Sequence, residues 1–346
     1  MRIILFGIIV LIVTSCAGNS VDKKKPIHHV SGGFRNLDET KKGQGLYKVF
    51  LWQFNKLFNN NPSVDPSDYD FDVLKNDGKK LKENSTKLSV TWIGHATTLV
   101  QVDGLNILTD PIWSERCSPV SFAGPKRYTP PGISIDDLPN IDIVVISHNH
   151  YDHMDIPTLK LLEKKFRPVF IVGLKNKKFL VKEGLTNVRE MDWWESINVR
   201  NLKVTFTPTQ HFSSRGVFDR DATLWGSYVL EGKKNKIYFA GDTGYSSSFK
   251  MIGEKFPEID IAILPIGAYE PIWFMQPIHM SPKESVQSFL DLNAKYMVPM
   301  HYLTFVLTDE ALDEPLKITK ELMQKNSSLD RLLDLKIGET KIFSKD

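Results

Sequence analysis

The stretch "SHNHYDH" at residues 147–153 follows the apolar run "IDIVVI" at 141–146, and it holds three of the chain's nine histidines. A short apolar run of this kind predicts a buried strand. The polar stretch therefore begins where a loop leaves the strand and can project side chains into a cleft. Imidazole nitrogens and carboxylate oxygens are ligands that zinc readily takes. The H-x-H-x-D-H spacing thus predicts a metal site at the end of this strand.

Three residues farther along the chain also follow strand-like runs. His211 closes "VTFTPTQH", Asp242 closes "IYFAGD" and His301 closes "MVPMH". Together with the first cluster they exceed what one tetrahedral zinc needs, and they suit two metals held about 3.5–4 Å apart around a bridging hydroxide. The candidate ligands are His148, His150, Asp152, His153, His211, Asp242 and His301.

The region from residue 88 to 346 predicts one domain of mixed structure. Short strand-like runs such as "LSVTWIG" and "TTLVQVDG" come first, and later runs such as "PVFIVG" and "IDIAILPIGAY" alternate with helices. One helix is expected to start after Asp155, and another carries a capping box formed by Ser281 and Glu284. A late helix is expected near 309–325. This order suits an α/β fold in which two packed sheets have helices outside.

The metal cluster with its three distant partners resembles the metallo-β-lactamase superfamily, and "TWIGHATTLVQ" at 91–101 resembles the opening hairpin of that fold. A closer resemblance is to the family of N-acylphosphatidylethanolamine-hydrolysing phospholipases D. The stretches that carry it include "LTDPIWSERCSPVSFAGPKRY", "MDWWE" and "GAYEPIWFMQPIHMSPKE", and they spread over roughly residues 88–343. The resemblance implies an αββα sandwich with the active site at one edge between the sheets.

The resemblance also assigns roles to the candidate ligands. It implies two Zn²⁺ ions, one held by His148, His150 and His211 and the other by Asp152, His153 and His301. Asp242 would bridge them and would be catalytic together with His279 of "QPIHMSP". The implied reaction is attack of a bridging hydroxide on a phospholipid phosphodiester, which releases N-acylethanolamine and leaves phosphatidate. His279 would either stabilise the phosphate or protonate the leaving oxygen.

Other side chains are candidates for substrate contact. The aromatic residues could wall a groove for acyl chains, or could simply be core; the set is Tyr151, Trp193, Trp194, Trp225, Trp273 and Phe274, with Met275. Trp194, Trp273, Phe274 and Tyr151 are our expected substrate contacts. Lys126 and Arg127 either meet a phosphate or lie on the surface. His95 in "GHAT" is expected near the metals, where it would orient a ligand rather than bind metal.

The N-terminal segment has a different character. Residues 1–15 carry one basic residue and a short apolar core, and they predict a signal peptide. The ending Val-Thr-Ser before Cys16 resembles a bacterial lipobox, which implies a lipidated Cys16 and a bacterial cell-envelope location. A plain anchor or an ordinary signal peptide are the alternatives. Residues 16–45 would be a flexible tether and 46–87 a helical and loop extension, with a helix at 46–58. Cys117 would then have no intramolecular disulfide partner.

The charge balance bears on partners. The chain has 44 basic and 41 acidic residues and a net charge of +3, which gives no reason to expect a nucleic-acid partner. A membrane phospholipid is the expected substrate partner, and a homodimer is left open. The rival functions are a hydrolase of the same fold acting on another phosphodiester or a lactone, a redox protein that holds two irons, and a surface lipoprotein without catalysis.

Overall fold

The computed structural model describes residues 25–40, 51, 71–85 and 87–343. The expected signal peptide, Cys16, the first part of the tether and nearly all of the helix expected at 46–58 lie outside these residues. Among the residues that are described, no helix has both the length and the apolar character needed to cross a membrane.

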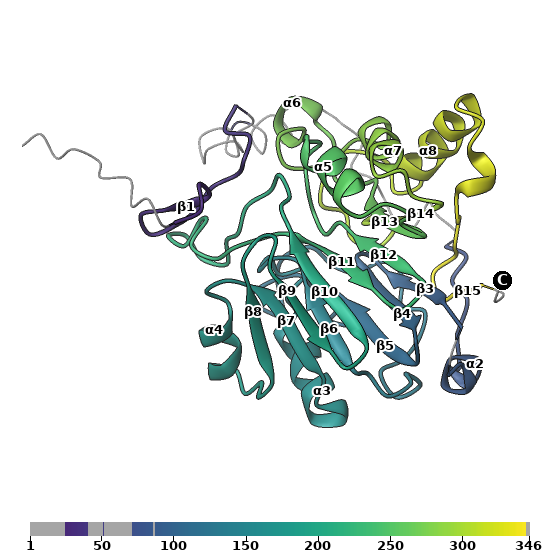
Figure 1. The fold of residues 1–346 in the computed structure, drawn as a ribbon, viewed down its shortest axis with the longest axis horizontal. Coiled ribbons are helices and arrows are strands. Elements are labelled where there is room, and N and C mark those ends of the chain that lie inside the picture. Colours follow the sequence, from purple (N-terminus) through teal and green to yellow (C-terminus); the bar gives the residue numbers. More distant parts are fainter. Residues whose placement is uncertain (1–24, 41–50, 52–70, 86, 344–346) are drawn as a thin grey trace, which may run out of the picture.

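Two large sheets pack face to face in the described part of the chain (Figure 1). The seven-stranded sheet has the order β15-β3-β4-β5-β6-β7-β8, and the six-stranded sheet has the order β14-β13-β12-β11-β10-β9. In each sheet one part is antiparallel and the other is parallel, with β5 to β8 and β12 to β14 forming the parallel parts. The strands of the first sheet are β3 (Ser89–Gly94), β4 (Thr97–Val102), β5 (Leu105–Thr109), β6 (Ile143–Ile146), β7 (Val169–Gly173), β8 (Val188–Met191) and β15 (Thr340–Ile342). Those of the second are β9 (Ser196–Val199), β10 (Leu202–Thr207), β11 (Ser227–Glu231), β12 (Lys236–Phe239), β13 (Ile261–Pro265) and β14 (Tyr296–Met300).

Helices cover the outer faces of both sheets, so the αββα sandwich expected from the sequence is confirmed (Figure 1). The helices α3 and α4 lie on the side of the first sheet, and α5, α7 and α8 lie on the side of the second. The helices are α2 (Lys79–Glu83), α3 (Ile156–Phe166), α4 (Lys177–Lys182), α5 (Ser248–Lys255), α6 (Ile272–Met275), α7 (Pro282–Asp291), α8 (Glu314–Lys325) and the 3₁₀ turn η2 (Leu329–Arg331).

The two helix starts expected from the sequence behave differently. At α7 the Ser281 side chain accepts from the Glu284 backbone and the Glu284 side chain accepts from the Ser281 backbone, so the capping box is confirmed. Asp155 does stand at the N-cap of α3, but its carboxylate makes no cap bond to the helix. It accepts hydrogen bonds from the hydroxyls of Ser114 and Thr158 instead. These bonds tie the loop after β5 to the start of α3.

Strand β6 shows why "IDIVVI" reads as one continuous apolar run. Successive strand residues point to opposite faces of a sheet. Ile143 and Val145 pack into the core between the sheets, whereas Val144 and Ile146 pack toward α3. Both faces of the strand are therefore buried, as parallel strands in an α/β sandwich usually are.

The edge strands β8 and β9 have no such run, and the sequence patterns did not predict them. Their sequences, "VREM" and "SINV", place exposed or half-buried side chains between the more buried ones. An edge strand of four residues buries too little apolar surface to leave a periodic pattern.

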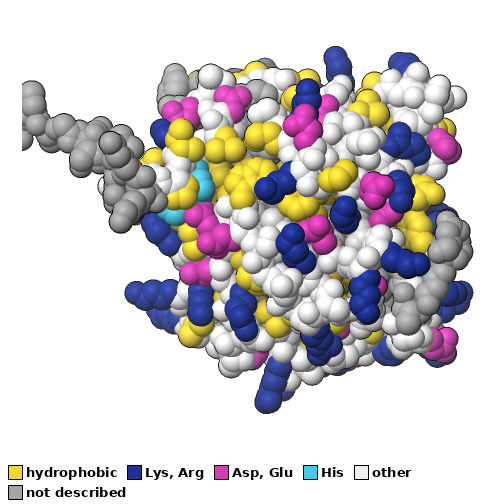
Figure 2. Space-filling model, in the orientation of Figure 1, with side chains coloured by type: hydrophobic (Ala, Val, Ile, Leu, Met, Phe, Trp, Pro, Cys, Tyr) yellow, Lys and Arg dark blue, Asp and Glu magenta, His cyan; other side chains and the backbone are white. Residues whose placement is uncertain are grey.

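Residues 25–40, which we call the N-terminal strap, correct one expectation. The sequence predicted a flexible tether over 16–45, yet the strap folds as a hairpin of β1 (His29–Val30) and β2 (Gly33–Phe34) against the domain. His28 and Phe34 are buried there, and the Phe34 backbone N–H donates to the Asp221 carbonyl at 2.9 Å. Figure 2 shows histidine side chains at the surface beside hydrophobic ones on this side of the molecule. Buried side chains and backbone pairing fix the strap in place.

One side chain of β11 links the two sheets through polar contacts. The Tyr228 hydroxyl donates to the carbonyl of Ile146 at 2.9 Å and to that of Ile171 at 3.0 Å, both in the opposite sheet. Tyr228 is fully buried, so no water can replace the hydroxyl if it is removed.

Replacing Tyr228 with phenylalanine should therefore lower the free energy of unfolding by about 1–3 kcal/mol, the usual cost of unpaired buried polar groups. Urea denaturation of the metal-free protein measures this. The matched control is Tyr128→Phe, whose ring is 39% exposed and whose change should stay within about 0.5 kcal/mol. Equal effects of the two changes would contradict the role given to Tyr228.

Candidate metal centre

All seven predicted ligands lie at one edge of the sandwich, on loops that leave the ends of four strands. The loop after β6 carries His148, His150, Asp152 and His153. His211 lies after β10, Asp242 after β12 and His301 directly after β14. Because β10, β12 and β14 run in the same direction, their carboxyl ends face the same edge, where open α/β sheets bind ligands.

Three histidines form a first group. The Nδ1 atom of His150 lies 2.7 Å from His148 Nε2 and 3.3 Å from His211 Nε2. One ring nitrogen of each residue lies within 4.8 Å of those of the other two, so the three can hold one metal ion together.

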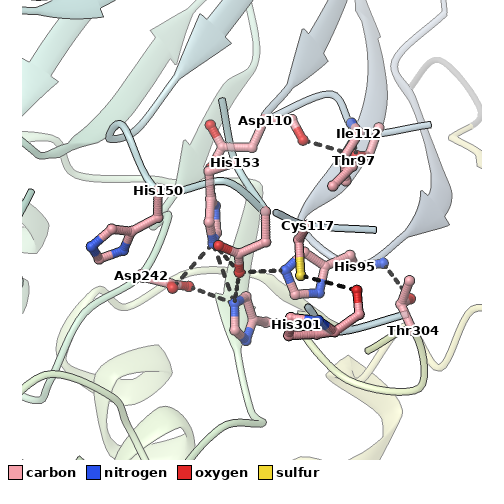
Figure 3. Close-up of polar contacts among 12 residues, drawn as sticks. His95, Thr97, Asp110, Ile112, Cys117, His150, His153, Asp242, His301 and Thr304 are labelled. Carbon is pink, nitrogen blue, oxygen red and sulfur yellow. Dashed lines mark hydrogen bonds and ion pairs between the residues drawn. The ribbon is translucent and has the colours of Figure 1, made fainter. Parts of the chain in front are cut away.

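The second group contains Asp152, His153 and His301. The Oδ2 atom of Asp152 is 3.2 Å from His153 Nε2 and 3.3 Å from His301 Nε2, and these two nitrogens are 3.3 Å apart. Figure 3 shows the His153 and His301 rings pointing toward the carboxylate of Asp242.

Asp242 lies between the two groups. Its Oδ2 is 3.1 Å from His153 Nε2, and its Oδ1 is 3.1 Å from His301 Nε2. The same Oδ2 is 4.0 Å from His148 Nε2 and 3.9 Å from His211 Nε2. A carboxylate in this position can ligate both metals of a pair, as the sequence resemblance implied.

The outer nitrogens of three rings have acceptors that fix the tautomer. His211 Nδ1 donates to the Ile278 carbonyl at 2.8 Å, and His153 Nδ1 donates to Asp110 Oδ2 at 2.6 Å. The Ser147 hydroxyl donates to Asp110 at 2.5 Å, which leaves its oxygen to accept from His148 Nδ1 at 2.9 Å. In each case the proton is on Nδ1, so the lone pair of Nε2 faces the centre.

Asp110 is a residue that the sequence reasoning missed as part of the site. It is fully buried, and besides Ser147 Oγ and His153 its carboxylate accepts from the Ser147 backbone N–H at 2.7 Å. The signal was present in "LTDP", because Asp110 directly follows β5, the parallel neighbour of β6. A short polar residue at such a strand end points toward the same edge as the metal loop.

The electrostatics of the site favour bound positive charge. Burial alone would raise the pKa of Asp242, but the charges of His153 and His301 hold it well below the usual range. Burial would lower the pKa of His301, yet Asp242 and Asp152 raise it to about 9. Burial and the neighbouring histidines hold the pKa of His148 well below its usual value, so its ring stays neutral.

The donor set therefore fits divalent metal ions. The neutral rings of His148 and His211 both turn the lone pair of Nε2 toward the same point, and neither ring brings an N–H group to that point. The second group together with Asp242 places two carboxylates against two imidazoles in a buried space, where an uncompensated charge is costly. Cations held by both groups satisfy these lone pairs and charges together.

The backbone is held in rarely populated conformations at three places around the site. His95, Asp110 and His301 have φ angles of 53°, 33° and 65°. The surroundings enforce them: the His95 N–H donates to Thr304 Oγ1 at 2.8 Å, and the His301 N–H donates to the His95 carbonyl at 3.1 Å. Such strain persists where a site requires it.

His95 and His279 lie beside the two groups. His95 Nε2 is 2.9 Å from Asp152 Oδ2, a position that orients this carboxylate or adds a fourth donor to the second group. His279 Nδ1 is 3.9 Å from Asp242 Oδ2 and is buried without a hydrogen-bond partner. Both residues are thus at the site, as the sequence predicted.

The aromatic set is divided by the structure. Trp193 and Trp225 belong to the core, since the Trp193 indole donates to the Trp225 carbonyl at 2.6 Å. Trp194 also packs on the core, with Lys255 over its ring at 5.5 Å, so the structure does not bring it to the ligands. Trp193 and Trp225 are buried in the core and Trp194 is half-buried against it, which is why these three do not line a groove at the ligands.

Tyr151, Trp273 and Phe274 lie on segments that also carry site residues. The Tyr151 hydroxyl donates to the Arg215 carbonyl at 2.8 Å within the metal-binding loops. Trp273 and Phe274 lie in α6, which ends four residues before His279, and Trp273 is 50% exposed.

Arg127 is not available for a phosphate. Its guanidinium donates to the backbone carbonyls of Ser114, Thr129 and Ile112, and it lies 5.0 Å from the centre of the Phe305 ring. Burial lowers its pKa to about 10. It therefore ties loops together behind the site, whereas Lys126 is exposed.

An Asp110→Asn change should weaken metal binding. The amide would turn an N–H group toward a donor and disturb the tautomers of His148 and His153, and loss of such partners usually lowers metal affinity about tenfold to hundredfold. Chelator competition measures the affinity. The control is Asp142→Asn. Asp142 directly precedes β6, at the end of the strand away from the metal loop, and its carboxylate accepts from the Asn106 backbone N–H at 2.9 Å. Unchanged affinity in the Asp110 variant would refute this role.

Comparison with known proteins agrees with this geometry. Residues 105–302 match the family described as "Beta-lactamase superfamily domain". An uncharacterized protein of Mycobacterium tuberculosis is 42% identical over 68% of this chain and 63% of its own length, so the chain spans less than two thirds of that relative.

An N-acyl-phosphatidylethanolamine-hydrolyzing phospholipase D of Caenorhabditis elegans is 39% identical over 70% of this chain and 71% of its own. The solved structure of a metallo hydrolase from Ignicoccus hospitalis has the same fold, with a TM-score of 0.57 at 22% identity over 75% of this chain and 100% of that one. The chain therefore belongs to the metallo-β-lactamase superfamily.

Proposed function

We propose that the protein is a zinc-dependent phosphodiesterase of the phospholipase D type. It would hydrolyse N-acylphosphatidylethanolamine-type phospholipids to N-acylethanolamine and phosphatidate. The proposal that the reaction is a hydrolysis rests on the two donor groups and on Asp242, which lies between them. The relative from Caenorhabditis elegans supports the choice of substrate.

Zinc ions bound by the two groups would supply Lewis acidity and lower the pKa of a water toward neutrality. The chain's own residues determine where this chemistry takes place. Asp242 fixes the relation between the groups, and Asp110 and Ser147 hold the rings of His148 and His153 in the required tautomer.

The position of His279 supports a role on the substrate. It follows α6, its ring centre is 5.2 Å from that of His211 and 5.7 Å from that of His301, and Nδ1 has no partner. A ring N–H at this position would donate a hydrogen bond to a phosphate oxygen or to the leaving oxygen, where negative charge develops.

Exposed apolar side chains on loops near the site support a lipid substrate. Phe218 is 100% exposed on the loop after His211, Phe122 is 81% exposed on the loop after Cys117, and Trp273 is exposed on α6 before His279. Water-exposed aromatic side chains of this kind favour contact with acyl chains or a membrane surface. A lipid anchor at Cys16 would hold the enzyme at such a surface and raise the effective substrate concentration.

The full chain, purified in detergent and loaded with zinc, should release N-acylethanolamine and phosphatidate from N-acylphosphatidylethanolamine vesicles. Mass spectrometry identifies both products. The matched variant Asp242→Asn should give neither, because it removes the charge shared by the two groups. If a preparation with two verified zinc ions yields no product, the substrate is wrong. Turnover of a lactone or another phosphodiester by that preparation would then replace it.

Replacing His279 with alanine should lower kcat by about 10²-fold, the usual cost of losing one donor to developing charge. Zinc content should not change, because the change removes none of the seven candidate ligands. The control is Gln276→Ala, an exposed position in the same segment, which bonds Glu284 at 3.0 Å. A loss of zinc equal to the loss of activity would show that His279 supports the metals instead.

A further inference from the structure

The N-terminal strap reaches the metal centre through one side chain, Asn36. Its Nδ2 donates to the His211 carbonyl at 2.8 Å, and its Oδ1 accepts from the His211 backbone N–H at 3.1 Å. The amide thus pairs with both backbone groups of a single residue. The same oxygen also accepts from the Trp225 indole at 3.0 Å.

Further contacts hold the strap in the position from which the Asn36 amide can pair with the His211 backbone. His28 Nε2 and His29 Nε2 each lie 2.7 Å from a different oxygen of Asp192, and the His28 ring stacks on Trp193 at 4.3 Å. On the other side of Asn36, the Gln210 amide donates to the Asp38 carbonyl at 3.0 Å.

Glycine at position 33 is needed for this fit. A Cβ atom there would lie 2.1 Å from the carbonyl oxygen of Asp221, which is backbone and cannot move aside easily. The strap therefore runs in direct contact with the loop that follows His211.

His211 is held at two points by these contacts. The Ile278 carbonyl accepts from ring atom Nδ1 and fixes the orientation of the ring, whereas Asn36 fixes the backbone from which the ring projects. Nε2 of His211 must reach a point shared with His148 and His150, and metal ligation tolerates displacements of only about 0.2 Å. None of the donors of the second group lies on the loop that carries His211.

We propose that Asn36 is a positioning residue for His211, so that the N-terminal strap is an integral part of the first metal group. The inference depends on His211 being a metal ligand in the proposed function, but not on the identity of the substrate. The strap would act on the group of His148, His150 and His211, and not on that of Asp152, His153 and His301.

The test is a titration of the full-length metal-free chain with Co²⁺ as the probe, compared with the Asn36→Asp variant. This variant keeps the acceptor for the His211 N–H and the Trp225 indole but loses the donor to the His211 carbonyl. We expect one of two Co²⁺ equivalents to bind about tenfold to hundredfold more weakly, while the other is unchanged. The visible absorption that is lost should be that of the all-histidine group, whose ligand field differs from that of the carboxylate-containing group.

Asn76→Asp is the matched control. The half-buried Asn76 amide also joins distant backbone, since it donates to the Gly338 carbonyl at 2.9 Å and accepts from the Gly78 N–H at 2.9 Å. The Asn76→Asp variant should lose about as much free energy of unfolding as the Asn36→Asp variant, but it should bind both Co²⁺ ions as tightly as the wild-type chain. Asn36→Ala, which removes both bonds to His211, should weaken the same equivalent at least as much as Asn36→Asp.

Two unchanged affinities in a folded Asn36 variant would overturn the proposal, and so would an equal weakening of both equivalents. A wild-type chain that binds fewer than two Co²⁺ ions would overturn it as well, because a weakening of one site and not the other requires two sites. Loss of the all-histidine signal in the variant, with no N-acylphosphatidylethanolamine turnover by the wild-type chain, would support this inference and reject only the proposed substrate.

Discussion

The structure depends on the burial of many metal-binding side chains at one place. Seven of the nine histidines gather with Asp152 and Asp242 at the edge between the sheets, and six of these nine side chains are buried while the other three are half-buried. Such a set is unfavourable in an apolar interior unless its lone pairs and charges are matched. The strand ends, the outer acceptors and the strained backbone around His95 and His301 can be understood as the means of holding this set together.

Residues that are not candidate ligands also hold the site in place. Asp110 connects the rings of the two groups through Ser147 and His153, and it comes from a strand that supplies no ligand itself. The remaining two histidines, His28 and His29, lie in the strap and bond Asp192. All nine histidines are thus used either in the site or in the segment that contacts it.

Much of the fold, and the edge at which the candidate ligands meet, could be predicted from the sequence because each candidate follows an apolar strand, a local pattern that is visible in single runs such as "IDIVVI". What could not be predicted depends on contacts between distant segments. Asn36 lies 175 residues from His211, and no periodicity marks it. Whether Trp193 and Trp225 wall a groove or lie in the core was left open by the sequence, because composition does not show which face of an element is buried; the structure places both in the core. The edge strands β8 and β9 were missed because they bury little apolar surface.

The origin of the ligands in both sheets has a thermodynamic consequence. The loop after β6 belongs to one sheet, and the residues after β10, β12 and β14 belong to the other, so bound metal joins the two halves as a cross-link would. Cys117 is a free thiol, and the described residues contain no disulfide that does this. Ligand binding to the folded state alone stabilises it in proportion to the logarithm of the free ligand concentration. The cohesion of the sandwich is therefore linked to the metal supply of its surroundings.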